Sequence, residues 1–196
     1  MLNNIVIMGP PGAGKGTIAN RLKDDFEYKL VAAGDLLRAE KDSGSELGKK
    51  IASIIDGGNL VPDNIIDSII YKEIKTPMRI TESFLIDGYP RSASQATMLE
   101  QMINVPIVIW INISDKTTIK RNLKRGLTSG RADDSTEEII KTRIENYKLT
   151  CEPIKKWYGN RLIEIDGEGT IDEVYKRVVD TLFETVKEPK EISEIK

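Results

Sequence analysis

Short, wholly apolar runs alternate along this chain with longer stretches in which apolar residues recur every three or four positions. Runs that are apolar at every residue, rather than at every second one, indicate strands buried on both faces of a parallel sheet. The expected strands are Asn4–Met8, Tyr28–Val31, Ser83–Ile86, Pro106–Ile111 and Leu162–Ile165. The expected helices are Gly14–Asp25, Asp35–Glu40, Glu46–Ile55, Asp63–Ile74, Ala93–Met102, Asp115–Lys124, Thr136–Tyr158 and Ile171–Val186. This alternation predicts an α/β fold of three layers, with helices on both faces of a parallel sheet.

Two segments depart from the simple alternation. About 50 residues with several helical patterns separate the second and third expected strands, more than a crossover between parallel strands needs. Residues 126–135 are polar and contain two glycines, so we expect a loop there. Both segments follow the carboxyl end of a strand, the edge at which open α/β sheets bind ligands. We therefore expect two mobile covers over a ligand site.

A glycine-rich segment joins the first expected strand to the first expected helix. Its spacing Gly9-x-x-x-x-Gly14-Lys15 fits the phosphate-binding P-loop. The glycines let the backbone curl closely around an anion, and the N–H groups of the helix start face it. Lys15 adds a cation for the outer phosphates. Gly16 stands where Ser or Thr is usual, with Thr17 following, but the context still predicts a nucleotide phosphate site.

The composition narrows the chemistry. The chain has 196 residues, of which 29 are basic and 31 acidic, with no histidine and a single cysteine, Cys151. The near balance of charge does not favour a nucleic-acid binder, and histidine bases and multi-cysteine zinc sites are excluded. No signal peptide is visible and no apolar stretch is long enough for a membrane span, so we expect a cytoplasmic protein. We expect Cys151 to be a buried packing residue and residues 187–196 to be a frayed tail.

A second motif, Asp87-Gly-Tyr-Pro-Arg91, follows the third expected strand. An acid at the end of a strand beside a P-loop holds Mg²⁺ directly or through water. The alternative for Asp87 is a cap on the strand end. The Gly-Tyr-Pro turn fixes the direction of Arg91, whose planar guanidinium suits a phosphate. The alternative for Arg91 is a solvated surface arginine.

These motifs resemble those of the nucleoside monophosphate kinases, and of adenylate kinase most closely. The resemblance runs to about residue 186 and rests on Gly9–Thr17, Ala33-Gly-Asp-Leu-Leu-Arg38, Gly58-Asn-Leu-Val-Pro62, Asp87–Arg91, Arg121-x-x-x-Arg125, Thr128-Ser-Gly-Arg131-x-Asp-Asp134 and Arg143. In that family a loop ending Gly-Lys-Gly-Thr is usual, which accounts for Gly16. The resemblance implies a P-loop NTPase-like fold with a five-stranded parallel sheet. It also implies one kinase domain over residues 1–190, with a helical monophosphate-binding insertion at 33–61 and a short lid at 125–135.

The resemblance implies a role for each candidate residue. ATP would lie on Gly12, Ala13, Gly14, Lys15, Gly16 and Thr17, with its adenine stacked on Arg121. The acceptor monophosphate would lie at Ala33, Arg38, Gly88, Arg91 and Gln95. The transferring phosphoryl group would be surrounded by Lys15, Arg91, Arg125, Arg131 and Arg143. Arg131, Asp133 and Asp134 would belong to the lid, the two aspartates helping to lock it when closed, and Asp87 would hold Mg²⁺ through water. No zinc is expected, because this short lid lacks the four cysteines of long-lid relatives. A monomer is expected by analogy.

The charge of the reactants supports these roles. MgATP and a monophosphate bring together roughly four net negative charges, so catalysis is mainly charge neutralisation and alignment. Lys15 and five arginines would supply that neutralisation. The alternative for any one arginine is an ion pair with a nearby carboxylate, from Asp133, Asp134, Glu137 or Glu138. A phosphate acceptor is already ionised near neutral pH, so the reaction needs no general base, in keeping with the absence of histidine.

Two positions bear on the acceptor base, and they disagree. Adenylate kinases usually place Thr before Gly34-Asp35, whereas this chain has Ala33, as UMP/CMP kinases do. Gln95, four residues after Arg91, is the adenylate kinase residue, where UMP/CMP kinases have Asn. We give Gln95 more weight, because its amide can donate to and accept from the adenine edge. Ser92-x-x-Gln95 is also a capping box, so Gln95 could instead cap a helix. The prediction is AMP as acceptor, with a UMP/CMP or broad-acceptor kinase as the alternative.

The motifs also separate this chain from two other classes of nucleotide-binding protein. A non-catalytic nucleotide sensor would be expected to lack Lys15 or the lid arginines, and all are present. A P-loop GTPase would need an Asn-Lys-x-Asp motif to read guanine, and this chain has none. A kinase is therefore the prediction.

Overall fold

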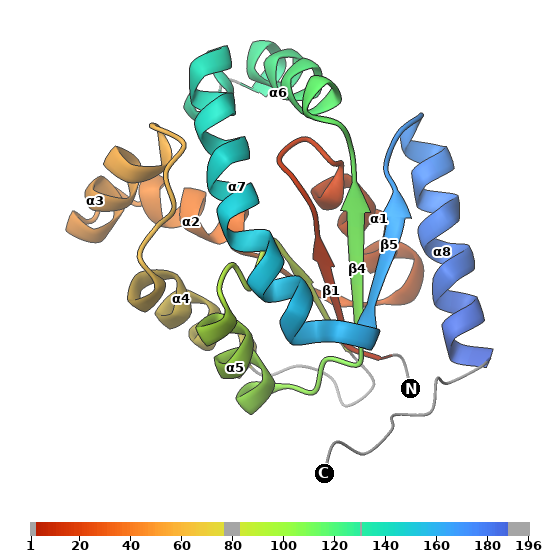
Figure 1. The fold of residues 1–196 in the computed structure, drawn as a ribbon. Coiled ribbons are helices and arrows are strands. Elements are labelled where there is room, and N and C mark those ends of the chain that lie inside the picture. The colour runs from red at the N-terminus through yellow and green to blue at the C-terminus, as the bar shows by residue number, and fades with distance from the viewer. Residues whose placement is uncertain (1–2, 77–82, 130, 188–196) are drawn as a thin grey trace.

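The structure is a computed structural model that describes residues 3–76, 83–129 and 131–187 (Figure 1). Five parallel strands form one sheet in the order β2-β3-β1-β4-β5. Their bounds are β1 Ile5–Met8, β2 Lys29–Ala32, β3 Phe84–Asp87, β4 Ile107–Asn112 and β5 Leu162–Asp166. β1 lies at the centre, with Ile5 opposite both Leu85 of β3 and Ile107 of β4. The predicted five-stranded parallel sheet is confirmed.

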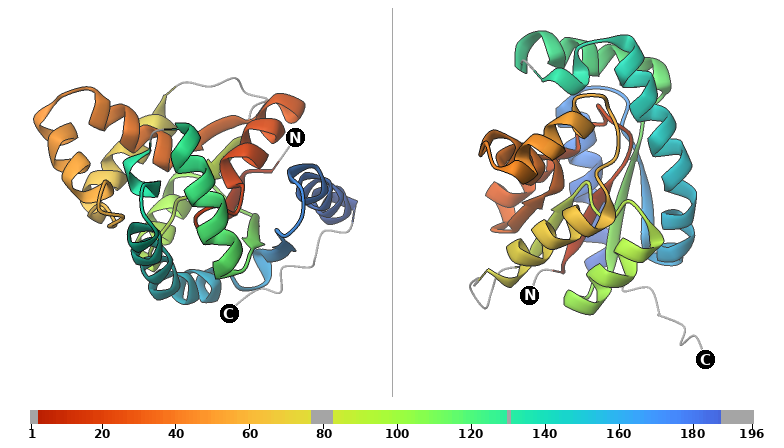
Figure 2. Two further views of the ribbon diagram at one scale, coloured as in Figure 1. Left: turned by 90° about the horizontal axis from the view of Figure 1, so that it is seen from above. Right: turned by 90° about the vertical axis from the view of Figure 1, so that its left-hand side faces the viewer.

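Helices cover both faces of the sheet (Figures 1 and 2). They are α1 Lys15–Phe26, α2 Ala33–Asp42, α3 Glu46–Ile55, α4 Asp63–Lys75, α5 Ala93–Met102, α6 Asp115–Ser129, α7 Glu137–Tyr158 and α8 Ile171–Lys187, with short 3₁₀ helices η1 Ala132–Asp134 and η2 Gly159–Arg161. Within the described residues, no helix is long and apolar enough to cross a bilayer.

Alternate residues of the central strands enter two separate cores. Ile5 and Ile7 pack with residues of α1 and α8 on one face of the sheet. Val6 and Met8 pack on the other face with residues of α4, α5 and α7. All four side chains are at most 5% exposed. This burial on both faces is the physical reason for strands that are apolar at every residue.

The expected loop at residues 126–135 is the main correction to the predicted elements. α6 continues to Ser129, and η1 follows at Ala132–Asp134, so much of this segment is helical. Gly126 does not end α6; a Cβ atom there would lie 2.5 Å from the carbonyl oxygen of Asp134. The glycine therefore allows η1 to pack closely against α6. Of the expected tail, only Lys187, the last residue of α8, lies in the described residues.

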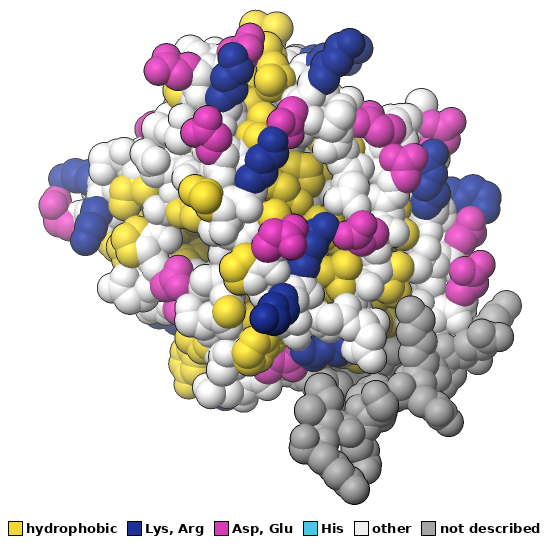
Figure 3. Space-filling view, viewed as in Figure 1, with side chains coloured by type: hydrophobic (Ala, Val, Ile, Leu, Met, Phe, Trp, Pro, Cys, Tyr) yellow, Lys and Arg dark blue, Asp and Glu magenta, His cyan; other side chains and the backbone are white. Residues whose placement is uncertain are grey.

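Basic and acidic side chains are mixed over the face seen in Figure 3, and neither sign gathers into a continuous patch there.

Candidate active site

The glycine-rich loop leaves β1 and enters α1 at the carboxyl edge of the sheet. Gly12 and Gly14 have φ angles of +78° and +85°, in the left-handed region that favours glycine. The Lys15 ammonium folds back over the loop and donates hydrogen bonds to the carbonyl oxygens of Gly9 and Pro10, both at 2.9 Å. The first N–H groups of a helix have no partner within the helix, so the start of α1 is suited to binding an anion.

Gly9 is required by close packing as well as by its φ angle of +143°. A Cβ atom at this position would lie 2.3 Å from the carbonyl oxygen of Ile111 in β4. We expect Gly9→Ala to lower the free energy of unfolding by about 1–3 kcal/mol and to weaken ATP binding at least tenfold, because the loop must shift. Urea denaturation and calorimetric ATP titration measure both effects.

Gly44→Ala is the matched control for Gly9→Ala. Gly44 has a φ angle of +72°, but a Cβ atom there would meet nothing within 4 Å. This variant should carry only the backbone strain, about 1–2 kcal/mol, and should leave ATP affinity unchanged. Equal ATP affinity in the two variants would contradict the role given to the contact between Gly9 and β4.

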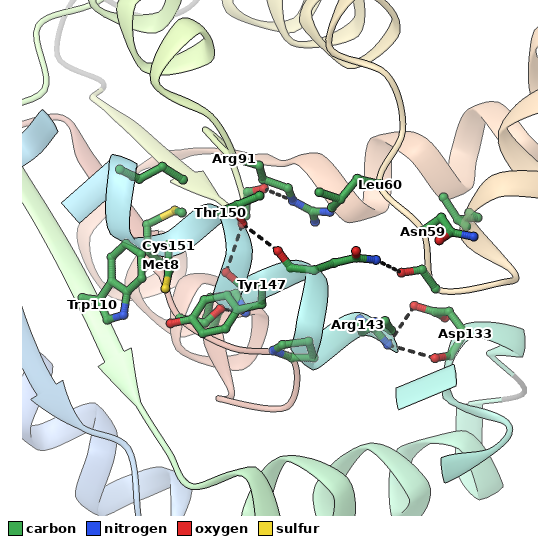
Figure 4. A pocket seen from close by; sticks show the side chains of 18 of the residues that line it. Met8, Asn59, Leu60, Arg91, Trp110, Asp133, Arg143, Tyr147, Thr150 and Cys151 are labelled. Atoms are coloured by element: carbon green, nitrogen blue, oxygen red, sulfur yellow. Dashed lines mark hydrogen bonds and ion pairs between the residues drawn. The ribbon is translucent and has the colours of Figure 1, made fainter. Parts of the chain in front are cut away.

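A cavity of about 140 Å³ opens beside the P-loop and reaches from the α2 side to α7 (Figure 4). Its wall carries four basic side chains: Lys15, Arg38, Arg91 and Arg143. They come from the first residue of α1, from α2, from the turn after β3 and from α7. Arg91 is oriented by a hydrogen bond of 2.9 Å from its Nε to the carbonyl oxygen of Gly88. Residues more than 100 positions apart are thus collected at one point suited to an anion.

Desolvation and neighbouring positive charge lower the pKa values of Lys15 and Arg91. Although part of Lys15 faces the cavity, desolvation of its ammonium lowers the pKa to about 8. Asp87 opposes that shift, whereas Arg91 and Arg143 add to it. Desolvation, followed by the charge of Arg143, lowers the pKa of Arg91. An incoming anion would relieve this repulsion.

Asp87 ends β3 beside the P-loop. A Cβ atom built on Gly16 would lie 3.5 Å from Asp87 Oδ2, so the carboxylate is next to the position at which P-loops usually carry a hydroxyl. Desolvation raises the pKa of Asp87, and Lys15 opposes that shift. A single carboxylate beside a phosphate site suits Mg²⁺, which takes one or two carboxylates together with phosphates and water.

Arg125 and Arg143 meet at a buried carboxylate. Asp134 is 1% exposed and accepts hydrogen bonds from Arg125 Nε at 2.6 Å and Nη2 at 3.0 Å. It also accepts a bond from Arg143, whose Nη1 lies 3.0 Å from Asp133 Oδ2. The ion pairs considered as an alternative for these arginines are therefore formed here. Only Arg143 of the two borders the cavity.

Arg131 extends from the predicted lid toward the predicted monophosphate-binding segment. Its Nη2 lies 4.0 Å from Asp35 Oδ1 on α2, and the same oxygen accepts from Arg38 Nη2 at 2.5 Å. Arg121 lies apart from the cavity and donates to the carbonyl oxygens of Gly167 and Gly169 at 3.1 and 2.9 Å. The structure thus brings Lys15, Arg38, Arg91 and Arg143 together, but leaves Arg121, Arg125 and Arg131 outside the cavity wall.

Ala33 and Gln95 face one smaller cavity of about 130 Å³, which Gly88 and Arg91 also border. Ser92 caps α5 by accepting from Gln95 N, so half of the predicted capping box is formed. The Gln95 side chain does not complete it: Oε1 accepts instead from the N–H of Arg91 at 2.6 Å. The amide is therefore placed on the cavity wall rather than used as a cap on Ser92.

Cys151 packs against the core, as expected of a packing residue, but it is half-buried rather than buried. It lines the larger cavity together with Met8, Trp110 and Tyr147 (Figure 4). The sequence motifs did not predict this part of the cavity wall. The spacing of Tyr147, Cys151 and Ile154 on one side of α7 was the available signal, because positions three and four apart share a helix face.

The P-loop at the centre of this sheet, facing a cavity lined by cations, defines a P-loop kinase-like protein. The family model described as adenylate kinase matches residues 7–163. The chain is 41% identical over 177 residues to adenylate kinase isoenzyme 1 of Gallus gallus, covering 89% of this chain and 91% of that protein. It is 39% identical over 186 residues to adenylate kinase isoenzyme 1 of Sus scrofa, covering 93% and 95%. The adenylate kinase of Stenotrophomonas maltophilia (strain K279a) is 36% identical over 182 residues, covering 89% and 96%.

The chain therefore belongs to the adenylate kinase family. It is a nucleoside monophosphate kinase, an enzyme that transfers a phosphoryl group to a phosphate acceptor.

Proposed function

We propose that this enzyme transfers the terminal phosphoryl group of MgATP reversibly to AMP, giving two ADP. The observation that carries the proposal is the set of four basic side chains on one cavity wall beside the P-loop, namely Lys15, Arg38, Arg91 and Arg143. Two anions must come into contact for direct transfer between phosphates. Fixed positive charge at their meeting point both aligns them and stabilises the charge of the transition state.

In this proposal the P-loop holds the donor. The backbone N–H groups of Gly12–Thr17 and the ammonium of Lys15 bind the β- and γ-phosphates. Arg121 flanks the donor adenine, and its hydrogen bond to the carbonyl oxygen of Gly12 ties it to the loop. Asp87 is suited to hold Mg²⁺ through water, since its carboxylate lies next to Gly16. When bound, Mg²⁺ neutralises charge on the donor phosphates.

Arg38 and Arg91 hold the acceptor phosphate. Arg125, Arg131 and Arg143 act when the lid closes, and in the present structure all three approach carboxylates. Asp133 and Asp134 hold two of these arginines in place until a phosphoryl group competes for them. The acceptor phosphate is already ionised, so no side chain is assigned as a general base. The closed lid excludes water, the competing acceptor.

We also propose that the enzyme acts as a monomer in the cytoplasm. Light scattering at several protein concentrations tests the first statement, and fractionation of the source cells tests the second.

Initial rates with MgATP and each of AMP, CMP, UMP and GMP test the proposed acceptor. We expect kcat/KM for AMP to exceed the others by a hundredfold or more, roughly 2.7 kcal/mol of discrimination. The Gln95 amide supports AMP, because it can pair with the adenine edge. A higher kcat/KM for UMP or CMP would contradict AMP as the acceptor. Ala33, rather than Gln95, would then be the residue that indicates the acceptor base.

Ala33→Thr tests the second position that bears on the base. Ala33 is 1% exposed and borders the same cavity as Gln95. The added hydroxyl should sharpen the ratio of kcat/KM for AMP over CMP and UMP about three- to tenfold, because a buried polar group then needs a partner on the base. An unchanged ratio, measured with a thermal denaturation control, would contradict this reading of Ala33.

A further inference from the structure

The side chain of Gln95 is held at both ends by groups of opposite hydrogen-bonding character. Its Oε1 accepts from the backbone N–H of Arg91 at 2.6 Å, and its Nε2 donates to Asp63 Oδ1 at 2.8 Å. A backbone N–H can only donate, and an ionised carboxylate can only accept. These two partners therefore allow one orientation of the Gln95 amide and oppose the reversed one.

Asp63 is held in turn by the start of the neighbouring helix. It is the first residue of α4, and its Oδ2 accepts from Ser92 Oγ at 2.9 Å and from Ser94 Oγ at 3.2 Å. The carboxylate thus joins the first turns of α4 and α5. Gln95 itself is only 2% exposed, whereas Asp63 is exposed. A water molecule in place of the carboxylate could either accept or donate, so it would favour neither orientation of the amide.

We propose that Asp63 is a positioning residue that sets the acceptor base by fixing the orientation of the Gln95 amide. The inference rests on the proposed function, with AMP as acceptor. A glutamine amide offers two lone pairs and two N–H groups, and the protein partners use one of each. One acceptor and one donor remain for a base, and Asp63, which also borders the smaller cavity, acts through them.

Adenine and hypoxanthine distinguish the two orientations of the amide. Adenine donates from its 6-amino group and accepts at N1, which matches a fixed acceptor and donor on Gln95. Hypoxanthine has the same ring system but accepts at O6 and donates from N1, so it matches the reversed amide. The ratio of AMP to IMP therefore reports the orientation of Gln95 with no change in the size of the base.

The test compares kcat/KM for AMP and for IMP, with MgATP as donor, in the wild type and in variants of Asp63. Asp63→Leu removes the acceptor but keeps a side chain that branches at Cγ, and we expect the AMP/IMP ratio to fall at least tenfold. The ratio should not invert, because the N–H of Arg91 still favours the original orientation. Asp63→Ala repeats the loss without a larger apolar side chain, should Asp63→Leu fail to fold.

Asp63→Asn tests rescue by the conservative change. Its Oδ1 can still accept from Gln95 Nε2, and its Nδ2 can donate to the hydroxyls of Ser92 and Ser94. The AMP/IMP ratio should stay within threefold of the wild type. Ser94→Ala, which removes a bond to Asp63 without touching Gln95, should also leave the ratio unchanged.

A purely structural role for Asp63 would lower kcat/KM for AMP and IMP equally. An unchanged ratio in Asp63→Leu and Asp63→Ala would overturn the inference, as would an equal fall of the ratio in Asp63→Asn. The activity of the wild type toward AMP distinguishes a failure of this inference from a failure of the proposed function. A wild type that prefers AMP, together with variants that keep its ratio, removes only the inference, whereas a wild type that does not phosphorylate AMP removes both.

Discussion

Replacing Arg91 by alanine should lower kcat by about a thousandfold while leaving the fold intact. Arg91 faces the cavity beside Lys15 and Arg143, and its guanidinium is aimed there by the bond from Nε to the Gly88 carbonyl oxygen. Without Arg91, the transferring or accepting phosphate would lose a bidentate contact. That contact is strongest when the charge of the phosphate is redistributed in the transition state. Arginines at such positions are worth factors of about 10³–10⁵ in phosphoryl transfer.

Two further variants test whether the loss of kcat in Arg91→Ala is specific to the guanidinium of this residue. Arg91→Lys keeps the charge but not the planar fork, and we expect kcat between those of the wild type and Arg91→Ala. Arg21→Ala removes an arginine that pairs with Asp172 and stacks on Tyr175, and should leave kcat unchanged. Circular dichroism and thermal denaturation verify folding. Near-normal turnover of a folded Arg91→Ala enzyme would remove Arg91 from the site.

The sequence predicted the sheet because its signal is local. Neighbouring residues such as Ile5 and Val6 enter opposite cores, so each strand shows as a run of apolar residues. The end of α6 was not predictable in the same way. Gly126 normally indicates a helix end, but here it accommodates the carbonyl oxygen of Asp134, a contact that no local pattern reveals.

In the candidate site, too, local motifs were predictable from the sequence and contacts between separate elements were not. Lys15 and Arg91 belong to short motifs whose turns fix their direction, and the structure places both on the cavity wall. Their partners belong to other elements. Arg131 approaches Asp35 on α2, and Gln95 bonds to Asp63 on α4, 32 residues earlier in the chain. Such pairs depend on how helices pack against one another, which one sequence without its structure does not specify.

Replacing Lys15 by methionine should lower kcat by about a thousandfold or more without lowering stability at pH 7. The ammonium is the P-loop cation nearest the donor phosphates in the proposed complex, and methionine fills similar space without charge. Burial suits the Lys15 ammonium to binding an anion, but without an anion it disfavours the charged form. The pKa of Lys15 therefore falls from 10.5 to about 8. The unfolded chain therefore binds this proton more tightly than the folded protein.

The free energy of unfolding of the wild type therefore depends on pH through Lys15. Below about pH 8 protonated Lys15 opposes folding, by up to about 3 kcal/mol, and this opposition disappears as pH rises from about 8 toward 10.5. Loss of the hydrogen bonds to Gly9 and Pro10, about 1 kcal/mol each, offsets part of the gain in Lys15→Met. In urea denaturation the variant should match or exceed the wild type at pH 7, and the wild type should gain on it by pH 10.

Lys49→Met is the control for Lys15→Met, because Lys49 is exposed and pairs with Glu46 on the surface of α3. It should change neither kcat nor the difference between the two pH values. A difference in unfolding free energy between Lys15→Met and the wild type that stays constant from pH 7 to pH 10 would contradict a lowered pKa at Lys15. Turnover of Lys15→Met within tenfold of the wild type would instead contradict its role at the phosphates. The two measurements therefore test separately why a buried cation is unfavourable for the empty protein and why the reaction needs it.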